Sequence, residues 1–153
     1  IDELDALIHR SVVIKNEIVS QDLTENGIRK SLNFGHTLGH AIESYFLEHE
    51  SKTTLLHGEA IAVGMILESY ISFRKNLISE TELALIKTTL LHYFEKVKFE
   101  SNDLAPILDL LIHDKKNEYG KVQFCLLNSI GKTIYNQEAD NELIIESFDF
   151  YNS

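Results

Sequence analysis

The chain is poor in several residue types, and each shortage excludes a class of protein. Its single cysteine, Cys125, excludes an internal disulfide framework and suits a reducing compartment such as the cytoplasm. With one proline and seven glycines, the 153 residues show no repeat and no low-complexity tract. We therefore expect a single domain over residues 1–153, long enough to bury a hydrophobic core.

Long apolar runs and an excess of positive charge are also missing. No apolar stretch is long and charge-free enough to span a bilayer, and no signal-like segment opens the chain. The formal net charge of −10 leaves no basic face to neutralise the phosphates of a nucleic acid. We expect a cytoplasmic protein that binds neither membrane nor nucleic acid.

Two common catalytic signatures are absent as well. The chain has no Gly-x-Gly-x-x-Gly segment, so nothing in it is expected to hold the pyrophosphate of a dinucleotide. No serine or cysteine nucleophile with a partnered base is visible. The chain begins with Ile1 and enters a helical pattern at once, as a piece of a longer protein does, although a processed chain would begin in the same way.

The pattern of apolar residues predicts a mainly α-helical domain with one short β-hairpin near 122–135. A content of 44% apolar and 25% charged residues is typical of globular domains. We expect the helices at about 2–19, 26–48 and 58–76, then from Ser79, from Asn102 or Asp103, and from Glu142 to Phe150. The 58–76 segment is apolar nearly all round, as a central buried helix would be.

Local signals refine this scheme. Thr24 or Asn26 is a plausible cap for the helix expected at 26–48, and Ser79 with Glu82 forms a capping-box pattern. Gly35 and Gly39 lie on one face of the 26–48 helix. Each costs about 1 kcal/mol relative to alanine in a helix, so we interpret them as permitting the close approach of another helix or of a ligand.

A polar stripe is the most informative feature of the sequence. On an α-helix with about 100° per residue, residues spaced i, i+4, i+7 and i+11 share one narrow face. The residues at this spacing are Arg29, Asn33, His36 and His40. An apolar core does not use a cation, an amide and two imidazoles in a row. The stripe therefore indicates chemistry on an anionic, hydroxylated ligand, together with a metal.

Histidines are the candidate metal ligands. His36 and His40 are four residues apart, a spacing that can place two imidazole nitrogens on one zinc ion. His57 begins the next helix after a short polar loop. Any two of these three with a carboxylate would form a catalytic zinc site with an open position, whereas a single histidine is more often structural.

Lysines supply candidate anion contacts. Lys15 lies in the apolar stripe of the first helix, where it either extends along its stem to solvent or presents a charge to a carboxylate or phosphate. Lys115 and Lys116 follow a helix end, where cations complement the helix dipole, but they could also project into an anion site. Against an acidic background, these cations and Arg29 suggest positive charge concentrated at a substrate. The dipeptide His113-Asp114 weakly suggests a zinc phosphohydrolase.

The motifs together resemble 3-dehydroquinate synthase, specifically its C-terminal, mainly helical half. The resemblance covers about residues 2–131. It is carried by Glu25-x-Gly27-x-Arg29-x-x-Leu-Asn33-Phe-Gly-His36-Thr-x-Gly-His40-Ala-Ile-Glu43, by Leu-His57-Gly-Glu59-Ala and by Asp114-Lys-Lys-x-x-x-Gly120. It implies the helical domain of the dehydroquinate synthase-like fold. The N-terminal α/β half, which binds NAD in this family, is not in this chain.

The resemblance also implies roles for individual residues. His36 and His57 match zinc ligands, and the third ligand, a glutamate, comes from upstream of this chain; another divalent metal such as cobalt can take the place of zinc. His40 matches a histidine that assists proton movement at a substrate hydroxyl. The matches to substrate-binding residues are Lys15, Arg29, Asn33 and one of Lys115 and Lys116, with Lys115 slightly favoured.

The implied activity is that of an NAD- and metal-dependent carbon–oxygen lyase of the shikimate pathway of aromatic amino-acid biosynthesis. It converts 3-deoxy-D-arabino-heptulosonate 7-phosphate to 3-dehydroquinate and phosphate. The alternatives are a sibling sugar-phosphate cyclase, which closes a different ring, or a zinc phosphohydrolase. The complete enzyme is expected to be a homodimer, and residues 1–153 without the NAD-binding domain are expected to be inactive.

Overall fold

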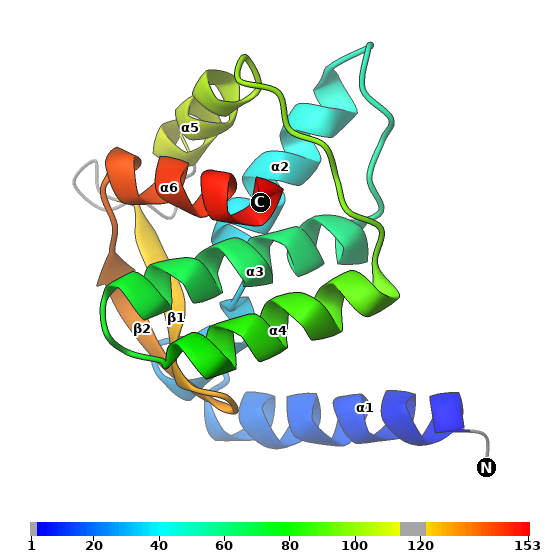
Figure 1. Cartoon of the computed structure of the whole chain (residues 1–153). Helices are drawn as coiled ribbons and strands as arrows, with labels where there is room; N and C mark the ends of the chain where they lie inside the picture. The colour runs from blue at the N-terminus through cyan, green and yellow to red at the C-terminus, as the bar shows by residue number, and fades with distance from the viewer. Residues whose placement is uncertain (1–2, 114–121) are drawn as a thin grey trace. The chain divides into compact units, whose positions relative to one another are not determined.

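The computed structural model describes residues 3–113 and 122–153 of the chain. The described part divides into two compact units, the first ending at Asn33 and the second running from Phe34 to Ser153. Helices predominate in both, and a two-stranded antiparallel hairpin belongs to the second (Figure 1). The expectation of a mainly α-helical fold with one hairpin is confirmed. Among the described residues, no helix is both long and apolar enough to cross a membrane.

The first unit contains α1 (Glu3–Gln21) and a short 3-10 helix, η1 (Ile28–Asn33). A turn between them is organised by Asp22, whose carboxylate accepts hydrogen bonds from the main-chain N–H groups of Asn26, Gly27 and Arg29. These bonds, led by that of Gly27, hold the pKa of Asp22 below its usual value. The cap expected at Thr24 or Asn26 is therefore supplied by Asp22 instead.

The second unit is built around α3, which contacts α2, α4, α6 and β1. Figure 1 shows α3 with α4 along one side and α6 along another. The elements of this unit are α2 (His36–Glu48), α3 (His57–Arg74), α4 (Glu80–Tyr93), α5 (Leu104–His113), β1 (Gln123–Ser129), β2 (Lys132–Glu138) and α6 (Asn141–Asn152). The buried central helix expected at 58–76 is thus α3, which has ten buried residues.

The core of the second unit lies where α3 meets its neighbours. Its fully buried members include Leu38, Leu67, Phe124, Ile144 and Tyr151, which come from four helices and strands. The hairpin contributes through β1, whose central residues are buried, while β2 is largely exposed. Because each buried aliphatic or aromatic side chain contributes about 1.5–3 kcal/mol, this core fixes the relative positions of α2 and α3.

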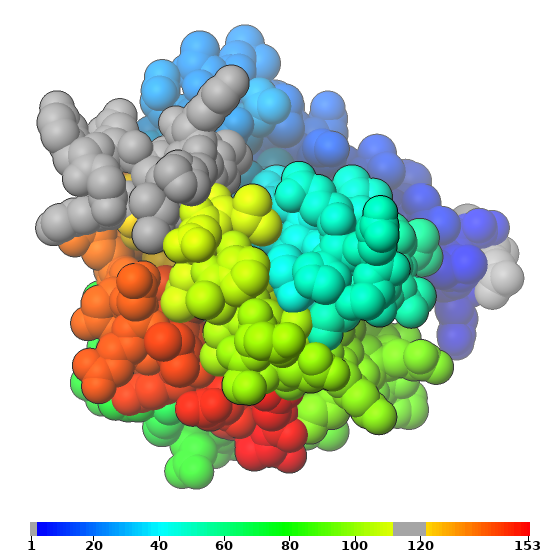
Figure 2. Space-filling view, turned by 90° about the horizontal axis from the view of Figure 1, so that it is seen from above, coloured from blue at the N-terminus to red at the C-terminus, as the bar shows by residue number. Residues whose placement is uncertain are grey.

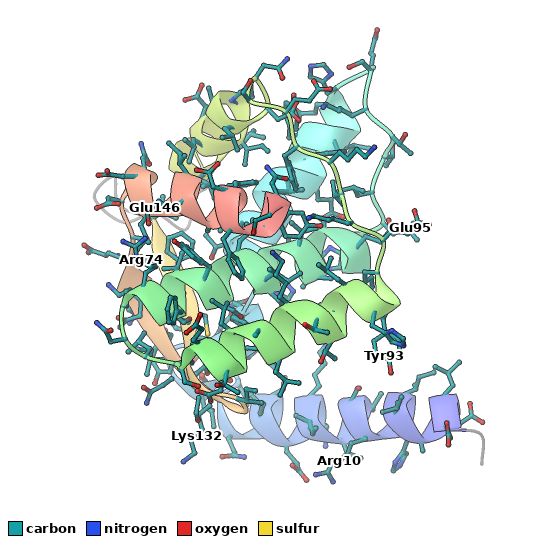
Figure 3. The ribbon with its side chains drawn as sticks, viewed as in Figure 1. Arg10, Arg74, Tyr93, Glu95, Lys132 and Glu146 are labelled. Atoms are coloured by element: carbon teal, nitrogen blue, oxygen red, sulfur yellow. The ribbon has the colours of Figure 1, made fainter. Side chains whose placement is uncertain are left out.

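Polar contacts fasten the periphery of the second unit. Arg74 near the end of α3 forms an ion pair with Glu146 of α6, and Figure 3 shows the two side chains directed toward one another. Ser79 and Glu82 form the expected capping box at the start of α4, and Asp140 caps α6 by accepting from Leu143 N–H.

A buried carboxylate joins α2, α5 and the loop that precedes α3. Asp103 is fully buried and accepts hydrogen bonds from the Tyr45 hydroxyl at 2.7 Å and the Lys52 ammonium at 2.8 Å. The main-chain N–H of Glu100 donates to the same carboxylate at 2.8 Å. Seen from above in Figure 2, the 49–55 loop and α5 lie side by side, as these bonds require. The loop that leads to His57 is therefore held by the Asp103 carboxylate, which accepts hydrogen bonds from all three of these groups.

Candidate metal and substrate site

The polar stripe does not lie on one helix. The expected helix at 26–48 is interrupted: η1 ends at Asn33, and α2 begins at His36 after Phe34 and Gly35. Gly35 has φ +80°, in the left-handed region that glycine adopts most easily, so the chain changes direction there. Arg29 and Asn33 consequently belong to η1, and only His36 and His40 share α2 as predicted.

The close-approach interpretation of the glycines is confirmed. A Cβ atom at Gly39 would lie 2.7 Å from Ile61 Cδ1, and one at Gly35 would lie 2.9 Å from the main-chain nitrogen of Met65. Gly64 of α3 faces this pair, since its Cβ would lie 2.7 Å from the nitrogen of Gly39. These three glycines let the backbones of α2 and α3 meet where the histidines are carried.

Three histidines converge at the start of α2 and α3. One ring nitrogen from each of His36, His40 and His57 lies within 4.8 Å of the others. The ring centroids form a near-equilateral triangle, 5.2 Å for His36–His40 and 5.7 Å for each of the pairs with His57. We call these three residues the histidine cluster. It brings His57, which is distant in sequence, beside the two histidines that share a helical face.

Two members of the cluster have their second ring nitrogen occupied. Nδ1 of His36 lies 3.2 Å from the carbonyl oxygen of Phe34, and Nδ1 of His57 lies 3.0 Å from a carboxylate oxygen of Glu43. Because a carbonyl or carboxylate oxygen accepts, Nδ1 of each ring donates, and in the neutral ring Nε2 then carries the lone pair. This is the arrangement that metal-ligating histidines adopt, with an acceptor fixing both ring orientation and tautomer.

The donor set fits a divalent metal. Neutral imidazole nitrogens suit zinc and cobalt, with bonds of about 2.0–2.1 Å for zinc. Three such nitrogens within 4.8 Å of one another can converge on one ion. The His57 side chain is 56% exposed, so a ligand can reach the cluster from solvent. His36 and His57 could hold the ion, and His40 lies close enough to act either as a third ligand or on a bound molecule.

Glu68 of α3 is fully buried and contacts the start of α2, which carries His36. Its Oε2 accepts from Gly35 N–H at 2.7 Å and its Oε1 from Leu38 N–H at 3.1 Å, at the first turn of α2. Burial raises the pKa of Glu68 to about 8, although the main-chain N–H groups of Leu38, Gly35 and Thr37 act to lower it.

Three of the predicted anion-binding residues, Lys15, Arg29 and Asn33, belong to the first unit. Lys15 is exposed on α1, near the exposed Leu4 and Ile8 of its stripe. Arg29 donates from its main-chain N–H to Asp22 and from Nη1 to the carbonyl oxygen of Leu23 at 3.1 Å. The Asn33 amide donates to a carboxylate oxygen of Glu25 at 2.5 Å.

Other predicted residues lie outside the described part of the chain. Lys115, Lys116 and Asp114 fall in the undescribed 114–121 segment, and for His113 only the backbone is described. Cys125 is buried, and burial raises the pKa of its thiol to about 11.

Three glutamates that bind predicted site residues or the backbone beside them were given no role by the sequence analysis. Glu43 follows His40 by three residues on α2, and this i, i+3 spacing is a signal that could have found it. Glu25, which binds Asn33, has φ +57°, an uncommon conformation outside glycine. Glu68 gave no signal, because a glutamate in a central apolar helix has no partner visible in the sequence.

Comparisons with known proteins identify the family of this chain. The family model described as 3-dehydroquinate synthase C-terminal matches residues 1–117. A 3-dehydroquinate synthase from Parabacteroides distasonis is 40% identical over 148 residues, which cover 97% of this chain and 41% of that protein. One from a Picosynechococcus species is 41% identical over 150 residues, 95% of this chain and 39% of the relative. The chain therefore spans about two fifths of the relatives' length.

Solved structures show the same fold. A 2-deoxy-scyllo-inosose synthase, solved with carbaglucose-6-phosphate, NAD+ and Co2+, superposes with a TM-score of 0.75 at 32% identity, covering 95% of this chain and 40% of that one. A 2-epi-5-epi-valiolone synthase from Streptomyces hygroscopicus, solved with NAD+ and Zn2+, gives a TM-score of 0.70 at 24% identity, covering 96% and 39%. The family model matches about three quarters of this chain. The chain therefore belongs to the family of 3-dehydroquinate synthase C-terminal domains.

Proposed function

We propose that this chain is the metal- and substrate-binding part of an enzyme that converts 3-deoxy-D-arabino-heptulosonate 7-phosphate to 3-dehydroquinate and phosphate. The observation that carries the proposal is the histidine cluster, in which His36 and His57 each have Nδ1 bound and Nε2 available. Family membership and relatives at about 40% identity support the choice of reaction. The enzyme would be a cytoplasmic carbon–oxygen lyase of the shikimate pathway.

In this proposal His36 and His57 hold a divalent metal, zinc or cobalt, with a glutamate from upstream of the chain. A bound divalent ion supplies Lewis acidity, lowering the pKa of substrate hydroxyls and polarising a carbonyl. Glu43 and the Phe34 carbonyl keep the two imidazoles in the ligating tautomer. The cluster is thereby preorganised before substrate arrives.

His40 is assigned the proton transfer. Its ring lies 5.2 Å from that of His36 and 5.7 Å from that of His57, so a substrate hydroxyl held beside the two ligands is within its reach. Imidazole titrates near neutral pH, so it can take a proton from a hydroxyl and return it later.

Cationic and amide side chains are assigned the two anionic ends of the substrate. Lys15 would bind the carboxylate, and Arg29 and Asn33 would contact the substrate, including its phosphate region. One of Lys115 and Lys116, with Lys115 slightly favoured, would add a further contact. Holding the carboxylate and phosphate ends of the substrate would fix the position of its reacting carbon beside the histidine cluster. Asn33 comes three residues before His36 in the chain, so one continuous segment would carry both a substrate contact and a metal ligand.

NAD would be bound mainly by the N-terminal domain and supplies the transient oxidation and reduction. That domain and a second copy of the enzyme, in a homodimer, are the proposed partners. Because the NAD-binding residues and the glutamate ligand lie outside residues 1–153, we expect this chain alone to bind zinc weakly and to lack turnover.

A sibling sugar-phosphate cyclase is the second candidate. The 2-deoxy-scyllo-inosose synthase structure, at TM-score 0.75 and 32% identity, favours it. Lys15 favours dehydroquinate formation, because it is assigned to a carboxylate that the sugar-phosphate substrate of an inosose synthase lacks. A zinc phosphohydrolase would need His113 and Asp114 at the metal, and it accounts for neither Lys15 nor Asn33.

Product analysis separates these candidates. The chain, joined to its native upstream sequence and loaded with zinc and NAD, is given heptulosonate 7-phosphate or glucose 6-phosphate. The proposal expects 3-dehydroquinate and phosphate from the first and nothing from the second. A carbocycle from glucose 6-phosphate would identify a sibling cyclase, and phosphate release without NAD would identify a hydrolase.

A further inference from the structure

The start of α2 has no side-chain cap of its own. Its N-cap residue is Gly35, which carries no side chain, and it lies in the left-handed region with φ +80°. The first N–H groups of a helix have no partner within the helix, and leaving them unpaired in a protein interior is destabilising. Here they belong to the residues on either side of His36.

Glu68 from α3 takes the place of the missing cap. One carboxylate oxygen accepts from Gly35 N–H at 2.7 Å and the other from Leu38 N–H at 3.1 Å, so the side chain spans the first turn of α2. The side chain is fully buried, so water does not compete for these bonds. The two N–H donors and the helix dipole favour the ionised carboxylate, whereas burial favours the neutral acid.

The same face of α3 allows this contact. Gly64 lies one turn before Glu68, and a Cβ there would lie 2.7 Å from the nitrogen of Gly39. The absence of a side chain at Gly64 lets the start of α2 approach α3 closely enough for the carboxylate to reach its N–H groups. Since α3 begins at His57, the element that carries one histidine holds the start of the element that carries the other two.

From this geometry we infer that Glu68 is a positioning residue: it fixes the first turn of α2, and with it the orientation of His36 relative to His40 and His57. Its metal consequence rests on the proposed function. His36 lies between two residues whose N–H groups Glu68 binds, and its ring is further held by the Phe34 carbonyl. Without Glu68, the N–H groups of Gly35 and Leu38 lose their acceptor and the first turn of α2 is no longer held against α3. His36 then samples orientations that do not face His57.

Glu68→Gln is the informative variant because it keeps size and shape. Its amide retains one acceptor oxygen but presents an NH2 group to the other main-chain N–H, so one of the two bonds is lost. Asp103→Asn is the matched control. Asp103 is also a fully buried carboxylate that accepts a main-chain N–H, but its partners are Glu100, Tyr45 and Lys52 rather than the first turn of α2.

Two readouts on the 153-residue chain test the inference. Amide hydrogen exchange at Gly35 and Leu38 reports the turn itself. A Zn2+ titration, followed by the histidine ring NMR signals, reports the orientation of the cluster. We expect Glu68→Gln to speed exchange at both amides, to give more than one His36 ring signal, and to weaken Zn2+ binding about 10-fold, as loss of residues that orient metal ligands does. Asp103→Asn is expected to lower stability and leave both readouts as in the wild type.

The outcomes separate the inference from the proposed function. Unchanged exchange and unchanged Zn2+ affinity in Glu68→Gln would overturn the positioning role, as would equal Zn2+ losses in Glu68→Gln and Asp103→Asn. If the wild-type chain and its upstream-extended form both leave the histidine signals unmoved by Zn2+, the proposed metal site fails. Exchange at Gly35 and Leu38 then still decides whether Glu68 fixes the turn.

Discussion

At the scale of single residues, the site depends on which ring nitrogens remain available. His36 and His57 have Nδ1 engaged by oxygen acceptors, whereas His40 is assigned to protons rather than metal. We predict that His57→Ala in the complete enzyme abolishes zinc binding while His40→Ala retains the metal and loses turnover. Metal content after dialysis, measured alongside activity, tests this. Equal metal loss in both variants would instead support His36 and His40 as the ligand pair.

Glu43 gives a second prediction at this scale. Its carboxylate lies 3.0 Å from Nδ1 of His57 and fixes the tautomer that leaves Nε2 for the ion. We expect Glu43→Gln to lower zinc affinity about 10- to 100-fold, the range usual for such orienting partners. Competition with a chromophoric chelator measures it. Glu59→Gln is the control, because Glu59 lies in the first turn of α3, two residues after His57, but accepts from the Leu56 N–H rather than from a histidine. Similar losses in both variants would contradict the specific role of Glu43.

The sequence predicted the histidines well and their supports poorly. His36, His40 and His57 were found because their spacing and their place at helix starts are local properties. The break between Asn33 and His36 was not predicted, because the periodicity of the polar stripe continues through Gly35 as if the helix did. The contact that holds the start of α2 comes from Glu68, which is 33 residues from Gly35 and has no sequence signal.

At the scale of elements, the close approach of α2 and α3 decides where the histidines stand. We predict that Gly64→Ala lowers the free energy of unfolding by about 1–3 kcal/mol, as over-packing does, because its Cβ would meet the backbone of Gly39 at 2.7 Å.

Gly58→Ala is the matched substitution in the same helix. Apart from its chain neighbours and the backbone of its own helix, no atom of the described residues lies within 4 Å of a Cβ at Gly58. We expect stability to stay within about 1 kcal/mol of the wild type. Urea unfolding followed by circular dichroism compares the two. Equal stabilities for Gly64→Ala and Gly58→Ala would show that the helices are not in the close contact described.

The elements themselves were largely predictable. The apolar pattern placed α1, α3 and the hairpin near their observed bounds, and the capping box at Ser79 placed the start of α4. Helices with a long apolar periodicity and helix ends with local capping residues can be predicted directly from a sequence. The turn before η1 was assigned to the wrong cap, because Asp22 reaches forward to Gly27 and Arg29 rather than capping the next turn locally.

At the scale of the whole molecule, the buried Asp103 links stability to pH. Burial alone would raise the pKa of Asp103, but the Glu100 N–H, Lys52 and Tyr45 together hold it below its ordinary value of 3.8. A lowered pKa in the folded state contributes stability above the unfolded value, and this contribution is lost as pH falls through the folded value.

We therefore predict that Asp103→Asn costs about 1.5–3 kcal/mol at neutral pH, the range for hydrogen bonds to charged groups. The difference between the wild type and the variant should shrink as pH falls below about 4. Urea unfolding at pH 7, 5 and 3 measures this difference. A difference that is constant over this range would contradict the ionised network of Tyr45, Lys52 and Asp103.

The central claim is that this chain supplies the metal and substrate site of a dehydroquinate-forming cyclase, and turnover tests it most directly. The measurement is 3-dehydroquinate formation from heptulosonate 7-phosphate, with zinc content and NAD dependence recorded, by residues 1–153 alone and joined to their native upstream sequence. We expect NAD- and zinc-dependent product from the joined protein, loss of that product in His57→Ala, and no product from the chain alone. Product from the chain alone, or from a zinc-loaded joined protein without NAD, would contradict it.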